Sequence, residues 1–202
     1  MKIKHLLLMS FLFGLVFASC SESSVENKYA NWRERNEAFI DSIATVFEQK
    51  KDPDLFRYED QRNIGNYIYY KVLESGDQSS DLPYLTSTVN VFYRGMLIDL
   101  LGSPVINLLK EPRYITKAYK KLPVFDKNFT EDYPNFETNQ PTAYVVGNLV
   151  SGWIEILQHM HEGDRWELYI PYRSGYGSTP NGAIPAYSTL IFDLTRLDIV
   201  KP

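Results

Sequence analysis

The chain has 202 residues, a length typical of one domain, and 44% of them are hydrophobic, which excludes a disordered composition and allows a sizeable core. The formal net charge at pH 7 is −4, and no segment clusters Lys and Arg, so the charge argues against a nucleic-acid partner. The single cysteine, Cys20, excludes a disulfide within the chain.

Residues 1–19 have the pattern of an export signal. Lys2 and Lys4 precede an apolar stretch, residues 6–18, that is too short to span a bilayer comfortably. The stretch ends in "FASC", which resembles the lipobox of bacterial lipoproteins. That resemblance implies that Cys20 is lipidated, becomes the mature N-terminus and anchors the protein to a membrane. The alternative is an ordinary signal peptide followed by an unmodified cysteine.

Residues 20–55 are predicted to form a polar tether and an amphipathic helix. The polar stretch "SESSVEN" is suited to holding a domain away from a membrane, and a helical pattern runs from Lys28 to Lys51 before Pro53 stops it. Its apolar stripe must pack either on the domain behind it or on a second copy of the chain, which would make a homodimer. The stripe consists of Trp32, Phe39, Ile40, Ile43, Val46 and Phe47.

From Tyr67 onward the pattern changes to strands that lack crossover helices. Strand-like runs occur within residues 67–78, 87–99, 143–147, 165–171 and 188–199. Residues 125–142 are predicted to be a loop, and residues 100–123 have room for a short helix between prolines. This order indicates an α+β domain with an antiparallel sheet.

One helix is predicted inside this β region, within "NLVSGWIEILQHMHEG". Trp153, Ile156, Leu157 and Met160 recur at helical spacing, with Ser151 as the N-cap and Gly163 ending the helix. On these residues alone, Trp153 has two interpretations, a core side chain or the floor of a pocket. His159 and His161 are two positions apart and so lie on different helix faces, which argues against a shared metal.

Several separated motifs resemble the FKBP family of peptidyl-prolyl cis–trans isomerases in the family's own order. They are "VFYRGML" (91–97), "VFD" (124–126), "LVSGWIEILQHMHEGDRWELYIP" (149–171), "GYG" (175–177) and "AIPAYSTLIFDLTRL" (183–197). The resemblance implies a curved antiparallel sheet wrapped over one short helix, with an apolar pocket between them. It assigns residues 56–202 to an FKBP-like domain, interrupted by an insertion at about 100–123, with the helix of residues 20–55 as an N-terminal extension.

The same resemblance assigns roles within the pocket. It implies that Trp153 is the platform for the proline ring, that the Tyr176 hydroxyl and the Val150 N–H bind substrate carbonyls, and that Tyr93 and Asp126 form a polar wall. The implied catalytic residues are Tyr93, Asp126 and Tyr176, and the implied substrate-binding residues are Phe125, Leu149, Val150, Trp153, Ile184 and Phe192. No metal and no cofactor are implied.

Some of these residues also have structural interpretations. Phe192 lies on an alternating strand and would be buried whatever the function, Asp126 is placed to cap a turn, and Tyr93 fits an ordinary strand. One departure from the family pattern concerns the pocket wall, where an aromatic residue usually follows a proline. Here Thr142 follows Pro141.

The chemistry of prolyl isomerisation suits an apolar pocket, because it needs no nucleophile. The two resemblances together imply a peptidyl-prolyl cis–trans isomerase that assists the folding of exported proteins in the bacterial cell envelope, facing the periplasm or the cell exterior. Its expected partners are proline-containing unfolded polypeptides, macrolide ligands and, through the lipid anchor, a membrane. The alternative is a catalytically weak binding or chaperone module with the same fold.

Overall fold

The computed structural model describes residues 28–98 and 122–200. Cys20, the export signal, the polar tether and nearly all of the proposed insertion at 100–123 lie outside these ranges. None of the helices in the described ranges is long and apolar enough to cross a membrane.

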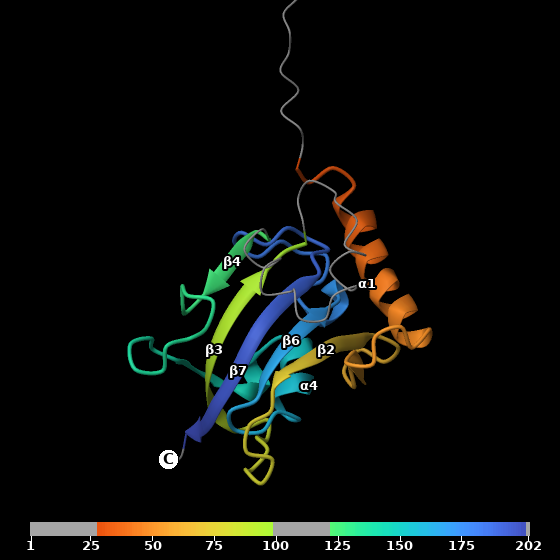
Figure 1. Cartoon of the computed structure of the whole chain (residues 1–202). Coiled ribbons are helices and arrows are strands. Elements are labelled where there is room, and N and C mark those ends of the chain that lie inside the picture. The colour runs from red at the N-terminus through yellow and green to blue at the C-terminus, as the bar shows by residue number, and fades with distance from the viewer. Residues whose placement is uncertain (1–27, 99–121, 201–202) are drawn as a thin grey trace, which may run out of the picture.

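One curved antiparallel sheet of seven strands forms the centre of the molecule (Figure 1). Six strands follow the order β1-β2-β6-β7-β3-β4, and β5 pairs with β3 beyond the end of the β4 pairing. The longest strand is β7, which pairs on one side with β6 and on the other with β3, so it lies at the middle of the sheet. The strands are β1 (Phe56–Glu59), β2 (Tyr67–Glu74), β3 (Thr88–Met96), β4 (Val124–Lys127), β5 (Thr142–Val145), β6 (Arg165–Ile170) and β7 (Leu190–Val200).

In the described residues, two α-helices lie on opposite faces of this sheet. Helix α4 (Ser151–Leu157) packs against Ile170, whose Cγ2 would lie 2.5 Å from a Cβ added at Gly152. Helix α1 (Trp32–Glu48) packs against the neighbouring residue Tyr169, whose ring centroid is 6.0 Å from that of Phe39. Consecutive side chains of a strand point to opposite faces, so the inner face carries α4 and the outer face carries α1.

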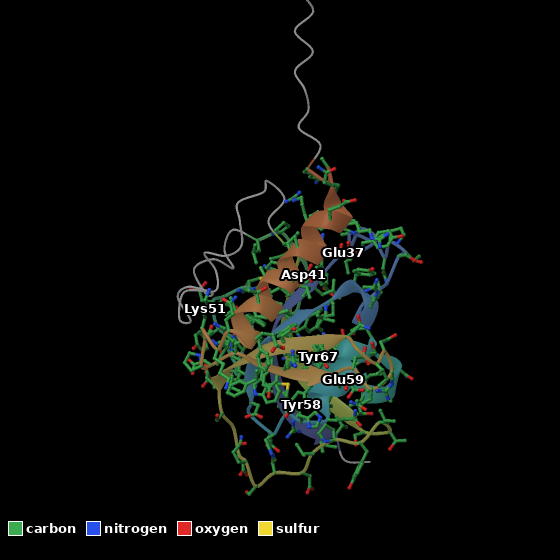
Figure 2. All side chains as sticks on the ribbon, turned by 90° about the vertical axis from the view of Figure 1, so that its right-hand side faces the viewer. Glu37, Asp41, Lys51, Tyr58, Glu59 and Tyr67 are labelled. Carbon is green, nitrogen blue, oxygen red and sulfur yellow. The ribbon has the colours of Figure 1, made fainter. Side chains whose placement is uncertain are left out.

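The N-terminal helix predicted from the apolar stripe is confirmed, and its partner is the sheet of the same chain. The Trp32 indole N–H donates to the Ser188 hydroxyl at 3.0 Å, and the Thr189 N–H donates to the Asn36 amide oxygen at 2.7 Å. Figure 2 shows α1 lying across the outer face above Tyr67. Of the two alternatives left open by the sequence, packing on the domain is the one observed.

Because α1 covers the outer face of the sheet, the polar side chains of strand β6 are buried as well as the apolar ones. All six residues of β6 are buried, although Arg165 and Glu167 alternate with apolar neighbours. The Arg165 guanidinium pairs with the buried Asp193 carboxylate at 2.6 Å, and the Tyr169 hydroxyl donates to Glu167. Buried charges persist when they are paired in this way, so both faces of β6 belong to the interior.

The structure corrects the predicted bounds of several elements. Helix α4 has Val150 as its N-cap, not Ser151, because the Ser151 hydroxyl donates to Asp60 at 2.7 Å instead of capping its own helix. The helix ends at Leu157, and Gly163 (φ +84°) lies in the turn before β6. The predicted loop at 125–142 contains most of β4 at its start, and β1 was not predicted, since four residues are too few to show a periodicity.

Candidate active site

A cavity of about 200 Å³ lies on the inner face of the sheet, at the N-terminal end of α4. Strands β3, β4, β5 and β7 contribute side chains to it, together with the turn η1 (Val146–Asn148) and the segment after the turn η2 (Tyr172–Ser174). The lining residues are Tyr93, Phe125, Asp126, Tyr144, Asn148, Leu149, Val150, Trp153, Tyr176, Leu190 and Phe192.

Eight of the nine pocket residues proposed from the sequence line this one cavity. The exception is Ile184, which is buried but does not line it. The backbone of Ile184 pairs in both directions with Asn181, at 2.9 Å each way, which fixes it in a tight turn. Residues that are far apart in the chain, from Tyr93 to Phe192, thus converge where β3 and β7 pass over the start of α4.

Trp153 is buried within this cavity, with 4% of its surface exposed. Three rings meet it edge to face: Phe192 at a centroid distance of 5.0 Å, Tyr93 at 5.6 Å and Tyr144 at 5.9 Å. Its indole N–H has no hydrogen-bond partner in the described part of the chain. Aromatic packing therefore fixes the orientation of the indole, and such edge-to-face pairs are favourable.

A chain of hydroxyl groups forms the polar wall of the pocket. The Tyr144 hydroxyl donates to the Tyr93 hydroxyl at 3.2 Å, and the Tyr93 hydroxyl donates to the Asp126 carboxylate at 2.7 Å. The other carboxylate oxygen of Asp126 accepts the Lys127 N–H at 2.8 Å. Burial raises the pKa of Tyr93 far above its usual value, and its bonds to Tyr144 and Asp126 raise it further, so Tyr93 is a neutral donor.

The donors expected from the resemblance lie at the edge of the cavity. Tyr176 is 39% exposed, and its hydroxyl forms no hydrogen bond with the described residues. Burial of the other part of the ring raises the pKa of Tyr176, so its O–H keeps its proton near neutral pH. Val150 precedes α4 in an extended conformation, and its N–H has no backbone partner in the described ranges. A carbonyl entering the cavity therefore finds two donors that no other described group occupies.

Three residues that line the cavity were not predicted from the sequence: Tyr144, Asn148 and Leu190. Tyr144 is the important omission, because its ring supplies the aromatic wall whose absence was inferred from Thr142. The signal was present in the sequence: side chains two positions apart on a strand share a face, so Tyr144 on β5 faces the same way as Thr142.

Gly95 on β3 explains how two rings fit at the back of the pocket. A Cβ at this position would lie 2.5 Å from the Phe125 ring and 2.7 Å from the Phe192 ring. These two rings pack edge to face, with their centroids 5.6 Å apart. Glycine is therefore required by the close approach of the side chains. Within residues 28–98 and 122–200, no three His, Cys, Asp or Glu side chains converge as a metal site would need.

Comparison with solved structures identifies the fold. The chain superposes on a peptidyl-prolyl cis-trans isomerase of Pseudomonas syringae with a TM-score of 0.56 and 21% identity, covering 83% of this chain and 95% of the other. It superposes on FkpA of Escherichia coli with a TM-score of 0.55 and 23% identity, covering 85% of this chain and 62% of FkpA. At such identities the likeness shows the fold alone, which is that of the FKBP class.

Comparison of sequences identifies the family. Residues 114–196 match the family described as FKBP-type peptidyl-prolyl cis-trans isomerase. A macrophage infectivity potentiator of Trypanosoma cruzi is 28% identical over 93% of this chain and 80% of that protein. The FKBP-type 22 kDa peptidyl-prolyl cis-trans isomerase of Escherichia coli is 31% identical over 66% of this chain and 50% of that enzyme, so the chain spans only half of this relative. The chain belongs to the family of FKBP-type peptidyl-prolyl cis–trans isomerases.

Proposed function

We propose that this chain catalyses cis–trans isomerisation of X–Pro bonds in polypeptides, and that the reaction takes place in the pocket above Trp153. The observation that carries the proposal is the arrangement of that pocket. A buried indole is surrounded by aromatic rings, and two free donors, the Tyr176 hydroxyl and the Val150 N–H, lie at the edge. This arrangement suits a proline ring flanked by two amide carbonyls.

The geometry lowers the barrier without covalent chemistry. Rotating an X–Pro bond breaks amide resonance at a cost of about 18–20 kcal/mol, and uncatalysed exchange takes roughly 10–100 s. The twisted amide has less charge separation than the planar one, so a water-poor aromatic pocket favours it relative to the ground state. The Tyr176 hydroxyl and Val150 N–H orient the flanking carbonyls, which holds the substrate in a conformation that permits rotation.

A proline tetrapeptide assay tests this proposal. Residues 28–202 should accelerate cis-to-trans exchange, whereas Trp153→Ala and Tyr176→Phe should reduce kcat/KM. Tyr133→Phe is the matched control, since Tyr133 is exposed and stacks on Arg165 away from the pocket. Natively folded protein that exchanges the peptide no faster than buffer would contradict the proposal.

The proposed setting is the bacterial cell envelope, where the domain of residues 56–202 assists the folding of exported polypeptides. Support comes from the "FASC" ending of the export pattern, which places Cys20 where a lipobox cysteine stands. Expression in a bacterium with a labelled fatty acid should label the wild-type chain and not Cys20→Ser. Recovery of both forms unlabelled from the soluble periplasmic fraction would instead favour an ordinary signal peptide.

Macrolides that mimic a proline ring are proposed ligands of the same pocket and should inhibit the isomerase competitively. The catalytically weak alternative was motivated in part by Thr142 in place of an aromatic wall residue, and the cavity of about 200 Å³, with Tyr144 in its lining, supports the isomerase instead. A homodimer through α1 is not part of the proposal, because the apolar side chains of α1, such as Phe39 and Ile43, are already buried in this chain.

A further inference from the structure

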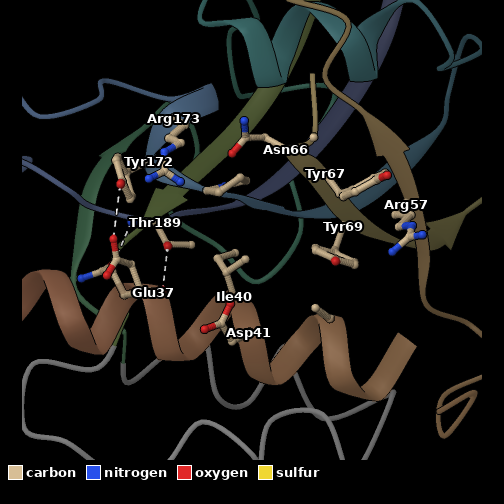
Figure 3. A pocket seen from close by; sticks show the side chains of 14 residues that line it. Glu37, Ile40, Asp41, Arg57, Asn66, Tyr67, Tyr69, Tyr172, Arg173 and Thr189 are labelled. Atoms are coloured by element: carbon tan, nitrogen blue, oxygen red, sulfur yellow. Dashed lines mark hydrogen bonds between the residues drawn. The ribbon is translucent and has the colours of Figure 1, made fainter. Parts of the chain in front are cut away.

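A second cavity, of about 380 Å³, lies between α1 and the outer face of the sheet (Figure 3). It is larger than the pocket above Trp153 and on the opposite face of the sheet. One wall is the middle of α1. The other wall is made by β1, β2 and the segment from Pro171 to Arg173, which includes part of η2. We call it the outer cleft.

Helix α1 is attached to the domain on both sides of the outer cleft. Toward its N-terminus, Asn36 accepts the Thr189 N–H and Glu37 accepts the Tyr172 hydroxyl. Toward its C-terminus, the Phe47 ring packs against Tyr69 at 6.0 Å and Glu48 pairs with Arg57 at 2.6 Å. These attachments stand about three turns apart, and the helix between them spans the cleft.

Between these attachments, Phe39 and Ile43 are buried against the sheet, whereas Ile40 and Ala44, on the side of the helix toward the cleft, are only partly buried. Ile40 and Ala44 face the outer cleft from the helix, and Tyr67, Tyr69 and Pro171 face it from the sheet. Such apolar and aromatic walls lose favourable burial when water stands between them. Ala44 is decisive here, because a larger side chain at this position would fill the space. The cleft therefore suits an aliphatic or aromatic side chain of a ligand.

Opposite charges flank this apolar middle. Glu37 is paired with Arg33 at 3.0 Å, and Arg57 is paired with Glu48, so these charges are already compensated. Asp41 on α1 forms no ion pair with the described residues. Arg173 on η2 interacts electrostatically with Glu37, which already pairs with Arg33, so two guanidinium groups share one carboxylate and this end of the cleft stays positive. Figure 3 shows Asp41 beside Ile40 on the helix and Arg173 on the opposite wall. A ligand that carries a cationic group and an anionic group on either side of an apolar one matches this distribution.

The outer cleft and the isomerase pocket are joined by one short turn. Tyr172 and Arg173 line the cleft, and Tyr176, a few residues later, lines the pocket. The Gly177 N–H donates to the Tyr172 carbonyl at 2.8 Å, which closes the turn between them. The edge of the pocket at Tyr176 and the edge of the cleft at Tyr172 and Arg173 are therefore parts of one short segment.

We propose that the outer cleft binds a second stretch of the unfolded polypeptide whose prolyl bond occupies the pocket. The stretch places an apolar or aromatic side chain against Ala44 and Tyr67, with a basic neighbour toward Asp41 and an acidic neighbour toward Arg173. This inference rests on the function proposed for the pocket. Two linked sites bind one chain more tightly than either alone, so the cleft would favour unfolded proteins over short peptides.

Direct binding tests the cleft without the pocket. The probe is a fluorescein-labelled, proline-free peptide in which Phe and Leu alternate with Lys and Glu. Ala44→Phe fills the cleft and should weaken binding about tenfold or more. Ala38→Phe is the matched control, since it adds the same side chain to the exposed side of the same helix, and it should bind as the wild type does. Equal affinity of the two variants would overturn the inference.

Isomerase kinetics distinguish the two proposals from each other. Ala44→Phe should leave kcat/KM for a proline tetrapeptide unchanged and raise KM about tenfold for a reduced, carboxymethylated, permanently unfolded protein. Inactivity of the wild type toward both substrates would contradict the function proposed for the pocket, whereas intact activity with no effect of Ala44→Phe would contradict only the cleft.

Two further measurements test the charges and the identity of the occupant. Asp41→Lys is an exposed substitution that should not prevent folding, and it should weaken binding of a peptide whose charged residues are all Lys while strengthening binding of the corresponding Glu peptide. No change with either peptide would contradict the proposed charge matching. Sedimentation that shows a dimer which Ala44→Phe dissociates would assign the cleft to a second copy of the chain and overturn the inference.

Discussion

Tyr144 gives the pocket wall a hydroxyl as well as a ring. Its ring packs edge to face with Trp153, and its hydroxyl donates to Tyr93, which in turn donates to Asp126. Tyr144→Phe keeps the ring and removes one hydrogen bond, which should lower the free energy of unfolding by about 1 kcal/mol. Because Tyr93 then loses a partner that orients it, kcat/KM should fall about fivefold. Peptide kinetics check this, with Tyr144→Ala as the harsher variant. A Phe variant as active as the wild type would show that the hydroxyl is dispensable.

Gly95 sets the positions of the two phenyl rings behind the pocket. The Cβ of Gly95→Ala would overlap the edges of Phe125 and Phe192, and those rings can move only by turning into the cavity or straining β3. Overpacking of this kind costs about 1–3 kcal/mol. We expect the free energy of unfolding, measured in urea, to fall by that amount, and the KM for the peptide to rise. Phe125→Leu in the alanine background should restore part of both, and its failure to do so would exclude this mechanism.

The sequence predicted pocket residues well where a residue type has one chemical use. Trp153 between a glycine and a helix, and Tyr176 between two glycines, have few structural alternatives, and both line the cavity. Ile184 does not line the cavity, and Tyr144, which does, was not predicted. Both outcomes have physical reasons. The contribution of Ile184 depends on the path of a loop, which no periodicity records. That of Tyr144 depends on which face of a four-residue strand points inward.

The start of α4 shows how one element is positioned by another. Asp60 follows β1 and is fully buried; it accepts the Ser151 hydroxyl at 2.7 Å, the Asn63 amide at 2.8 Å and the Arg62 N–H at 2.9 Å. These contacts hold the helix end next to Val150 against the loop after β1. Neither β1 nor this contact was predicted, because a short polar loop gives no signal of a partner 91 positions away.

Asp60 therefore links the stability of the fold to pH. Burial alone would raise the pKa of Asp60, but the hydroxyl groups of Ser174 and Ser151, the Asn63 amide and the Arg62 N–H lower it below the ordinary value of 3.8. The unfolded state then binds the proton more readily than the folded state. The ionised Asp60 carboxylate therefore stabilises the fold fully above pH 3.8, and this contribution is lost as the pH falls through the pKa of Asp60 in the folded state.

Asp60→Asn should reveal this contribution. It should lower the free energy of unfolding by about 1–3 kcal/mol at pH 7, and its difference from the wild type should shrink as the pH falls below 3.8. Urea unfolding at several pH values measures both, with the exposed Asp54→Asn as the control. A difference that stays constant with pH would mean that the carboxylate charge is not what stabilises the helix end.

At the scale of the whole molecule, the sheet is covered on both faces, and α1 is the outer layer. The amphipathic stripe predicted this helix, yet it left open whether the partner was the domain or a second copy, since a stripe records only that an apolar partner exists. The contacts that fix α1 on the domain come from residues far away in the sequence: Asn36 accepts the Thr189 N–H, and the Phe39 ring packs against the Tyr169 ring. Helix α1 is thus packed onto the domain that follows it.

This packing predicts that α1 and the sheet unfold as one cooperative unit. Phe39 and Ile43 on α1 are 3% and 0% exposed, and the opening of α1 alone would expose them together with Tyr169 and the charged side chains beneath the helix. Hydrogen exchange of the α1 amides should therefore report the same free energy of opening as the amides of β6 and β7. Amides around the exposed Ile64 should exchange much faster.

Phe39→Ala provides the decisive variant for this prediction. It should lower the free energy of opening by about 3–5 kcal/mol. The decrease should be the same in α1, β6 and β7, because the amides of one cooperative unit exchange through the same opening. If protection falls only in α1, the helix is a separately stable appendage. The outer cleft would then have a movable wall, and its affinity for a polypeptide would include the cost of holding that wall in place. Equal loss in all three elements means that the cleft is preformed, as binding without a conformational cost requires.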